Sequence, residues 1–533
     1  MAGLTKNTGK LSRFLLRRDR IRIPVWILSL AIITYTIALS FTDLYGSKAD
    51  RQAIAETMLN PAMTAMVGQG YGLDNYTYGA MMAHQMLLFT AITVAIMSIL
   101  LVTRHTRSDE EDGRIELIRS LPTGRLSNLF AALNVVFMTN FFMALLIGFG
   151  LAALDIESMD LEGSLLYGAA LGAIGFFFTA ITAVFAQLSE NSRGVIGLSF
   201  FVLGIAYILR AIGDVSNETL SWISPLGWIL GAEVYVNNYW WPILLTIGVS
   251  FILCILALYL NGIRDLGSGF LPAKPGKKHA SVLLKSPLGL SFRLQRTGII
   301  AWAIGMFVLG ASYGSVLGDL DTFFEDIDMM KQMLAPVDGY SLTEQFITML
   351  MSIMAMISTI PALMAQLKLM GEERKNRTEH LLSRAVSRTR LLSSSLIISI
   401  LVSFVMLSLA ALGLWSAGSV SINDGMDITV VYQAAIVYLP AMWVMIGLTA
   451  FLIGFLPQVS SWVWGYLIYS FIVVYLGNLI QFPEWMSSLS PFGHIPQIPI
   501  EDMNITAVTI LTISAIGLMV LGFIGYRQRD IGG

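Results

Sequence analysis

The residues best suited to bind a partner protein lie in one short charged segment between two long apolar runs. This segment, residues 108–125, reads S-D-E-E-D-G-R-I-E-L-I-R-S-L-P-T-G-R. A carboxylate such as Glu116 can form charge-assisted hydrogen bonds with an arginine or lysine of another protein. The segment can equally be the solvated surface of an ordinary loop between two membrane helices, so taken alone it leaves both interpretations open.

The spacing of residues within this segment predicts a short helix. Ser108 with Glu111 is a capping-box pattern, which predicts that the helix starts here. Ile115, Ile118 and Leu121 recur at three-residue spacing and therefore share one helical face. We therefore predict a charged helix that follows one apolar run and precedes the next.

The same charged helix occurs a second time in the chain. Residues 373–388 read E-R-K-N-R-T-E-H-L-L-S-R-A-V-S-R, and several positions are identical to the first copy at constant spacing. The identical pairs are Glu110 and Glu373, Arg114 and Arg377, Glu116 and Glu379, Ser120 and Ser383, and Arg125 and Arg388. This match in otherwise apolar sequence indicates a tandem duplication in which each half carries the helix at the same place.

The composition indicates a membrane protein. The chain has 533 residues, of which 55% are apolar and only 13% are charged, and its mean hydropathy is +0.70. A soluble protein carries roughly 25% charged residues. Apolar runs of about 18 or more residues recur, and each can cross a bilayer as a helix. We therefore predict an all-α polytopic membrane protein with about 12 transmembrane helices.

The apolar runs divide evenly between the two halves. In the first half they predict spans at 23–43, 78–103, 128–154, 164–188, 194–212 and 237–261. In the second half they predict spans at 298–318, 342–367, 391–417, 431–456, 461–480 and 504–526. The chain is thus expected to consist of a first half at 1–261, a cytoplasmic linker at 262–288 and a second half at 289–533. Because each half has an even number of spans, both enter the membrane the same way up, as parallel repeats.

The basic residues predict the orientation of the chain. They are concentrated in residues 1–22, 104–127, 262–297, 368–390 and 527–529. By the positive-inside rule these segments and both termini are cytoplasmic. Residues 11–22 mix Leu and Phe with Arg, which is typical of a helix at the membrane interface or of an ordinary basic flank. A matching segment lies at 290–296 in the second half.

Two further pairs of short motifs mark the duplication. S-P-L-G-W (224–228) and S-P-F-G-H (490–494) stand before the last span of each half. Their Pro and Gly predict a broken helical segment near the outer interface. R-D-L-G (264–267) and R-D-I-G (529–532) stand directly after the last span of each half. These motifs place the end of each repeat.

Motifs for ATP binding, metal binding and covalent catalysis are absent from the sequence. It contains no G-x-x-x-x-G-K-[ST] loop and no H-E-x-x-H or paired Cys/His pattern. The one cysteine, Cys254, lies in an apolar run and cannot form an internal disulfide. No chain of intramembrane acids indicates a proton relay. We predict that the chain is not an enzyme, binds no metal, cofactor or nucleic acid, and uses free energy supplied by another component.

The order of these features resembles that of type-2 ATP-binding-cassette (ABC) exporter permeases. The chain is similar in particular to the fused twelve-span permeases described as exporters of polyketide antibiotics. The first copy of the charged helix carries their motif, an acidic pair followed by G-x-x-E-L-x-x-S-L-P. In the second copy Asn376, His380 and Ala385 replace the Gly, the Leu and the Pro. Equal coupling by the two halves therefore does not follow from the resemblance.

The resemblance implies a separate ATPase subunit, two copies of which carry ATP and Mg²⁺ and dock beneath the two halves in a bacterial plasma membrane. The charged helices would then be coupling helices. The implied coupling residues are Glu110, Glu111, Gly113 and Glu116 in the first half, and Glu373, Arg377 and Glu379 in the second. The implied substrates are apolar or amphipathic compounds, antibiotic- or drug-like, that leave the cell.

In this family the substrate cavity is lined mainly by the second and fifth spans of each half. The residues that the resemblance places there, which can equally be packing or lipid-facing residues, are Gln85, Met86, Phe89, Phe200, Phe201, Met354 and Trp464. The abundant methionine, 28 residues, would suit varied apolar substrates and is explained equally well by core packing.

Two other functions are alternatives. A twelve-span secondary transporter driven by an ion gradient also has parallel halves. It would be expected to carry intramembrane acids, or a Gly- and Arg-rich loop between its second and third spans, and the sequence has neither. A membrane enzyme or assembly scaffold would need a polar catalytic constellation at membrane depth, which is also missing.

Overall fold

The chain consists of two helical units. The computed structural model describes residues 4–271, 278–319, 341–384, 386–422, 425–475 and 483–530. The units are Met1–Gly276 and Lys277–Gly533, so their boundary falls within the segment predicted as a linker. In the described residues, 11 helices are long and apolar enough to cross a membrane. This confirms the prediction of a polytopic all-α membrane protein.

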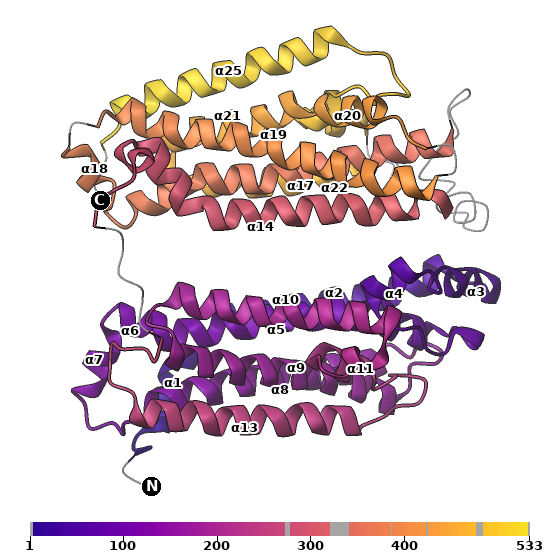
Figure 1. Cartoon of the computed structure of the whole chain (residues 1–533), viewed down its shortest axis with the longest axis vertical. Coiled ribbons are helices and arrows are strands. Elements are labelled where there is room, and N and C mark those ends of the chain that lie inside the picture. Colours follow the sequence, from indigo (N-terminus) through magenta and orange to yellow (C-terminus); the bar gives the residue numbers. More distant parts are fainter. Residues whose placement is uncertain are drawn as a thin grey trace. The chain divides into compact units, whose positions relative to one another are not determined.

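The first unit contains a membrane-length helix at each position where a span was predicted. These helices are α2 (Arg22–Leu44), α5 (Tyr78–Thr103), α8 (Ser127–Ala153), α9 (Leu161–Leu188), α10 (Ser192–Ser216) and α13 (Trp241–Ile263). Shorter helices lie before and between them: α1 (Thr8–Arg18), α3 (Lys48–Thr57), α4 (Pro61–Val67), α6 (Asp109–Glu111), α7 (Arg114–Arg119), α11 (Glu218–Ser221) and α12 (Pro225–Leu230). In Figure 1 the long helices run side by side, with α6 and α7 at one end and α3 and α4 at the other.

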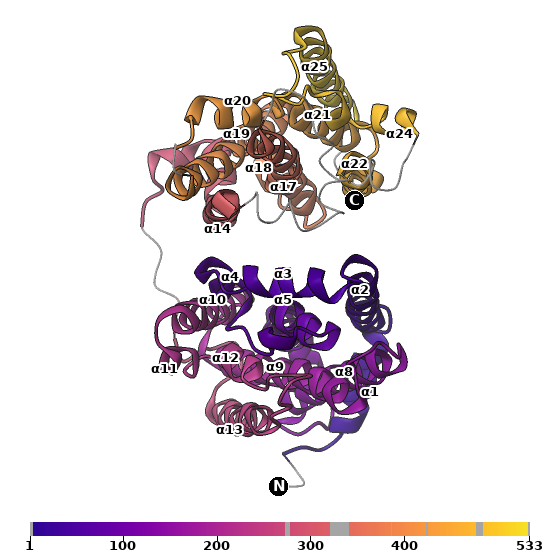
Figure 2. The same cartoon turned by 90° about the vertical axis from the view of Figure 1, so that its right-hand side faces the viewer.

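The helices α5 and α9 form the centre of the first unit. Figure 2, which looks along the long helices, shows them surrounded by α2, α8, α10 and α13. Most residues of α5 and α9 are buried, which is expected of helices that are apolar on every side. A buried polar contact joins α5 to α8, where the amide of Asn140 donates to the hydroxyl of Ser98 at 3.0 Å. A satisfied polar pair of this kind holds neighbouring apolar helices in a fixed register.

The second unit repeats this order of elements. Its long helices are α14 (Pro287–Val316), α17 (Leu342–Glu373), α19 (Arg388–Ser421), the pair α20 (Ile428–Ile436) and α21 (Leu439–Phe455), and α25 (Ile505–Gln528). Shorter helices are α18 (Glu379–Leu382), α22 (Val463–Tyr475) and α24 (Glu484–Ser488). The span predicted at 461–480 corresponds to α22, and its last residues lie outside the described part of the chain.

The predicted interfacial segment differs between the halves. In the first half it is the separate helix α1, which packs on α8 through the buried residues Leu11 and Leu15. The chain then turns before α2 begins at Arg22. In the second half the matching residues 290–296 belong to the single uninterrupted helix α14. The two segments are therefore equivalent in sequence but not in structure.

The duplicated S-P-x-G motif forms a short helical turn in both halves. The side chains of Ser224 and Ser490 each accept a hydrogen bond from the backbone N–H two residues later. Gly227 and Gly493 then pass so close to the preceding turn that a Cβ atom would lie 2.1 Å or 2.3 Å from a backbone carbonyl oxygen. Only glycine fits such a contact, which explains why both copies carry it.

Candidate functional site

The charged segment of the first half is a continuation of α5. After Thr103 the helix passes through a π-helical turn at Arg104–Ser108 and continues as α6. The predicted capping box at Ser108 is therefore wrong. Ser108 has helical backbone angles (φ −64°, ψ −39°), and its side chain caps nothing, because the helix has already begun far upstream. The charged segment is thus a rigid extension of a central membrane helix.

The chain leaves this extension at a left-handed turn that both halves share. Gly113 has φ +71° and Asn376 has φ +55°. Glycine adopts this conformation without penalty, and asparagine tolerates it better than other residues with a side chain. The replacement of Gly by Asn, a departure from the family motif, therefore preserves the turn that starts α7 and α18. The replacement at Ala385 lies outside the described residues.

Glu110 is bound within its own half. Its two carboxylate oxygens accept hydrogen bonds from the terminal nitrogens of Arg264 at 2.9 and 3.1 Å. The backbone N–H of Gly267 adds a third hydrogen bond at 2.7 Å, and Arg107 lies 3.2 Å away. The side chains of Glu110 and Arg264 are only 9% and 6% exposed. This acid therefore fastens the end of α5 to the R-D-L-G motif that follows α13.

The second half contains the same contact. The carboxylate of Glu373 forms an ion pair with Arg529, in the R-D-I-G motif, and accepts a hydrogen bond from the hydroxyl of Tyr526 at 2.6 Å. We call Glu110–Arg264 and Glu373–Arg529 the duplicated Glu–Arg pairs. Two of the residues implied by the resemblance as coupling acids are thus held inside their own unit, where they fix the charged segment of that half in place.

A second arginine, present in both copies of the repeat, forms a hydrogen bond next to each Glu–Arg pair. Arg125 donates to the backbone carbonyl oxygen of Arg264 at 3.0 Å. Its equivalent, Arg388, donates to the carbonyl oxygen of Arg529 at 2.6 Å. Both arginines lie at the start of the third span, so three helix ends meet at one point in each half. Two of the identities between the sequence copies, Glu110 with Glu373 and Arg125 with Arg388, are therefore explained by one repeated junction.

The neighbouring charged residues are also engaged. Glu111 accepts hydrogen bonds from the backbone N–H and the hydroxyl of Ser192, at 2.6 and 2.7 Å, where α10 begins. A carboxylate at this place is favoured by the partial positive charge of the helix N-terminus. Arg377, which lies in the turn after α17, pairs at 3.2 Å with Glu372 near the end of that helix.

Glu116 and Glu379 are different from the other acids. Both are exposed, on α7 and α18 respectively, and neither side chain has an ion pair or hydrogen bond within the described parts of the chain. The helix α7 is anchored by Ile115, which is buried, whereas Leu117 is 72% exposed. An exposed acid beside an exposed leucine, on a helix whose other face is fixed, is suited to contact another protein.

A cavity opens beside Glu379 in the second unit. It has a volume of about 550 Å³ and lies between the end of α17, the turn before α22 and Arg529. The cavity at the corresponding junction of the first unit has a volume of only about 20 Å³. The second unit could therefore admit a side chain of a partner at this junction, whereas the first unit offers the exposed face of α7.

The structure also contains an ion cluster in the first unit that the sequence did not predict. Arg18, near the end of α1, binds Asp109 at 2.8 Å. Asp19 lies 2.9 Å from Nε2 of His105 and 3.3 Å from Arg104. Burial raises the pKa of Asp19, but the hydrogen bond from His105 and the positive charges of Arg104 and Arg18 outweigh it and hold the pKa below its usual value. The cluster connects the helix α1 to the start of the charged segment at α6.

The residues implied to line a cavity in the first unit lie on two helices that touch each other, α5 and α10. Gln85 and Met86 are half-buried, and Phe89 is 39% exposed. Phe200 and Phe201 are 37% and 63% exposed. Their side chains therefore remain available for a ligand, a lipid or another surface.

The two residues implied in the second unit differ from each other. Met354 is 1% exposed and belongs to the apolar core of that unit. Trp464 is half-buried and packs against the same core. The burial of Met354 makes it a packing residue within its unit, so the analogy with the second span does not place it on a surface.

The sequence is similar to proteins of known description. The sequence model of the family "Multidrug efflux system permease Rv1217c, C-terminal domain" matches residues 12–260 and 284–527, a stretch in each half. The multidrug efflux system permease protein Rv1217c of Mycobacterium tuberculosis (strain ATCC 25618 / H37Rv) is 36% identical over 537 residues. That similarity covers 99% of this chain and 96% of the relative.

Proposed function

The chain belongs to the family of the multidrug efflux system permease Rv1217c, and we propose that it is the membrane-spanning permease of an ATP-driven ABC exporter. In this proposal it moves apolar or amphipathic drug-like compounds out of the cell. The chain itself binds no ATP, because it has no phosphate-binding loop. ATP and Mg²⁺ are bound and ATP is hydrolysed by a separate ATPase subunit, present in two copies.

The proposed orientation places α6, α7 and α18 in the cytoplasm of a bacterial cell. The basic segments at 104–127 and 368–390 carry these helices, and the positive-inside rule assigns such segments to the cytoplasmic side. Both termini lie on the same side in this orientation. The plasma membrane is the expected location, because ATP is available only at its inner face.

The observation that carries this proposal is the pair of exposed acids Glu116 and Glu379, neither of which has a side-chain partner among the residues that the structure describes. Each lies on a short helix that follows a rigid extension of the second span of its half. Both copies have kept a glutamate, exposed, at the same turn although the neighbouring residues have diverged. A partner that supplies arginine or lysine at both places accounts for it.

The duplicated Glu–Arg pairs supply the mechanical connection. A force applied to α7 reaches α5 through the continuous α6, and reaches α13 through Glu110 and Arg264. The corresponding path in the second unit runs from α18 to α25 through Glu373 and Arg529. In both halves a movement of the coupling segment is therefore communicated to the second and sixth spans together.

The experiment that tests the proposal measures transport in inside-out membrane vesicles. The chain is co-expressed with the ATPase subunit that co-purifies with it, and uptake of a fluorescent amphipathic drug is followed after addition of ATP. Uptake should persist when a protonophore collapses the ion gradient, and should stop when ATP is replaced by a non-hydrolysable analogue. Uptake driven by an ion gradient without ATP would instead establish the secondary-transporter alternative.

A further inference from the structure

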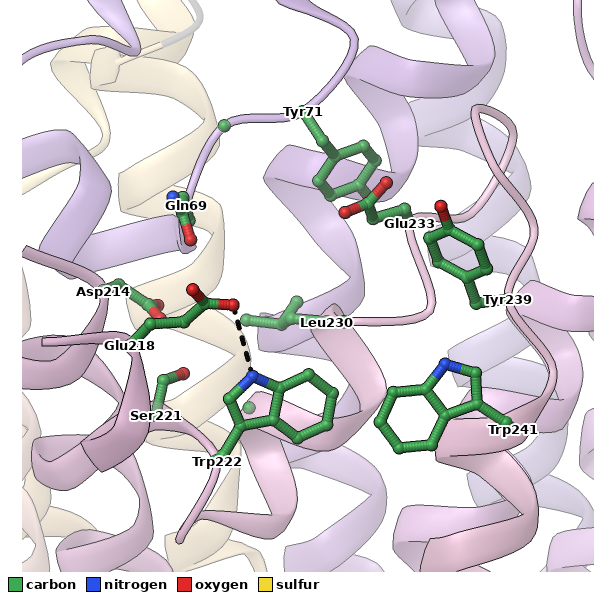
Figure 3. A pocket seen from close by; sticks show the side chains of 13 residues that line it. Gln69, Tyr71, Asp214, Glu218, Ser221, Trp222, Leu230, Glu233, Tyr239 and Trp241 are labelled. Atoms are coloured by element: carbon green, nitrogen blue, oxygen red, sulfur yellow. Dashed lines mark hydrogen bonds between the residues drawn. The ribbon is translucent and has the colours of Figure 1, made fainter.

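The first unit contains a second cavity, at the end opposite α7. Its volume is about 310 Å³, which lies within the range of ligand pockets in proteins. It is formed by the loop before α5, the end of α10, α11 and the loop between α12 and α13. Figure 3 shows Tyr71, Glu233 and Tyr239 approaching from one side, and Glu218, Trp222 and Trp241 from the other.

The cavity carries negative charge that the protein does not neutralise. Three carboxylates line it, but that of Asp214 is paired with Arg210 at 3.1 Å. Glu218 accepts a hydrogen bond from the indole N–H of Trp222 at 3.3 Å, and Glu233 accepts one from the amide of Asn237. Neither Glu218 nor Glu233 has a basic partner in the described residues. The cavity is therefore suited to a positively charged ligand.

The remaining lining favours an organic cation over a metal ion. Within the described parts of the chain, no three His, Cys, Asp or Glu side chains are grouped closely enough to hold a metal. Trp222 and Trp241 are stacked, with ring centroids 5.0 Å apart and planes at 15°. Aromatic rings attract cations through their faces and offer flat apolar area at the same time. A carboxylate next to such rings is the recognised chemistry for an aromatic or quaternary ammonium ligand.

The backbone beside the cavity is strained, which indicates that the cavity is built for a ligand. The loop that carries Glu233 holds three residues other than glycine in the left-handed region: Glu233 at φ +45°, Tyr235 at +64° and Asn238 at +52°. Such strained backbone costs about 1–3 kcal/mol for each residue and is concentrated at binding sites.

The paired indoles of the cavity are not repeated in the sequence of the second half. Aligning the two S-P-x-G motifs places Ser488 at the position of Trp222, so the second copy lacks one of the two stacked indoles. The feature is therefore not a by-product of the repeated fold, which would have produced it twice.

We propose that this cavity binds a monovalent organic cation with a flat aromatic body, and that such cations are among the exported compounds. The second part rests on the proposed function, whereas binding does not. Glu218 and Glu233 neutralise the positive charge, and the indoles of Trp222 and Trp241 contact the aromatic body. Because the site lies at the end opposite the coupling helices, it is a site from which ligand leaves the permease.

The test uses the full chain, purified alone in an uncharged detergent, and two probes that differ chiefly in charge. These are 1-methylquinolinium, a cation at every pH, and quinoline, which is neutral at pH 8. Equilibrium dialysis measures both affinities. We expect the cation to bind about tenfold or more tightly than quinoline, since a favourable charge contact of about 1.4 kcal/mol gives that factor. Equal affinities for the two probes would overturn the proposal.

The variant Glu218→Gln/Glu233→Gln removes both charges and keeps both side-chain shapes. It should weaken binding of 1-methylquinolinium about tenfold and leave quinoline binding unchanged. The matched control is Glu157→Gln/Glu162→Gln, which removes two exposed acids at the same end and should change neither affinity. If the first double variant does not elute as a folded protein, Glu218→Gln alone, on an exposed side chain, should lower the affinity about threefold. Unchanged affinity for the cation in the folded variant would contradict the proposal.

The two proposals fail in different ways. If the purified chain binds the cation as described but vesicles show no ATP-driven uptake of any drug, the proposed function is wrong and the binding site stands. If vesicles transport other drugs but Glu218→Gln/Glu233→Gln binds 1-methylquinolinium as the original chain does, the exporter stands and the assignment of this cavity is wrong.

Discussion

The carboxylate of Glu110 and the guanidinium of Arg264 form a two-pronged contact, at 2.9 and 3.1 Å, between residues that lie at the ends of different spans. Glu373 and Arg529 repeat it in the second half. Two diverged copies have thus retained one ion pair that is largely shielded from solvent. Retention of this pair at both places indicates that it fixes the coupling segment to the sixth span.

Removing Arg264 should destabilise the first unit strongly. Arg264→Met leaves Glu110 without its main partner in a largely buried place, and such a change costs about 3–5 kcal/mol. Glu110→Gln/Arg264→Met should cost less than Arg264→Met alone, because no unpaired charge remains. Thermal unfolding of the purified variants measures both effects. An unfolding temperature for Arg264→Met equal to that of the original chain would show that the pair is not important for the fold.

The proposed function predicts that reversing the charge of Glu116 uncouples the chain from the proposed ATPase subunit. Breaking a partly buried charge contact between proteins costs about 2–5 kcal/mol, or about 30-fold to several-thousand-fold in affinity. Glu116→Arg should therefore insert normally but lose drug-stimulated ATP hydrolysis and transport. Glu379→Arg should be impaired as well, since its turn is preserved. The control Glu157→Arg, an exposed acid at the opposite end, should behave as the original chain. Normal transport in both coupling variants would show that the two helices are merely solvated loops.

The left-handed turn of the second half predicts a selective response to substitution. Asn376→Gly should fold and function normally, because glycine adopts φ +55° freely. Asn376→Val should destabilise the turn by about 1–2 kcal/mol or more, because a branched side chain is strained there. Chemical unfolding and the ATP-hydrolysis assay distinguish the two variants. Equal stability of the Gly and Val variants would mean that residue 376 does not keep its left-handed conformation in the purified protein.

The proposed orientation predicts which residues an impermeant thiol reagent reaches. Cys254 is buried and is first replaced by Ser. Leu117→Cys, at a position 72% exposed on α7, should be labelled only after the cells are permeabilised. Ile223→Cys, at a position 59% exposed at the opposite end, should be labelled in intact cells. The reverse pattern would invert the orientation.

The buried ion cluster around Asp19 predicts a dependence of stability on pH. The pKa of Asp19 in the fold lies below its usual 3.8, so its contribution to stability is present above that pH and is lost as the pH falls further. Asp19→Asn should cost about 1.5–3 kcal/mol at neutral pH. The difference in unfolding temperature between the variant and the original chain, measured from about pH 5 downward, should shrink as the pH falls below about 4. A constant difference down to about pH 3 would contradict this assignment.

The membrane helices could be predicted well from sequence because each depends on a long local run of apolar residues. Predicted spans such as 78–103 and 342–367 begin where α5 and α17 begin. The error at Ser108 has the opposite origin. A capping-box pattern describes four residues, and it cannot reveal that a helix is already present upstream and continues through them.

The roles of individual acids could be predicted only in part. The duplication singled out both Glu110 and Glu116, but their spacing in the sequence could not show that Glu110 is bound within its own unit and Glu116 is exposed. Glu110 pairs with Arg264, which follows it in the sequence only after four further spans, and no local sequence pattern indicates a contact over that separation. The sequence does mark the R-D-L-G motif as part of the repeat. It does not show that the arginine of this motif pairs with Glu110.

Ser488 stands at the sequence position equivalent to Trp222, and this difference between the halves has a consequence for how the protein can change under drug selection. In a permease assembled from two identical chains, every substitution occurs twice, and a change that improves recognition on one side alters the other side as well. Here a single gene encodes both copies, so each position varies alone. A one-codon change at Glu218 would redirect ligand preference on one side while the other half keeps its inherited contacts. Covalent fusion thereby removes a symmetry constraint on the spectrum of exported compounds.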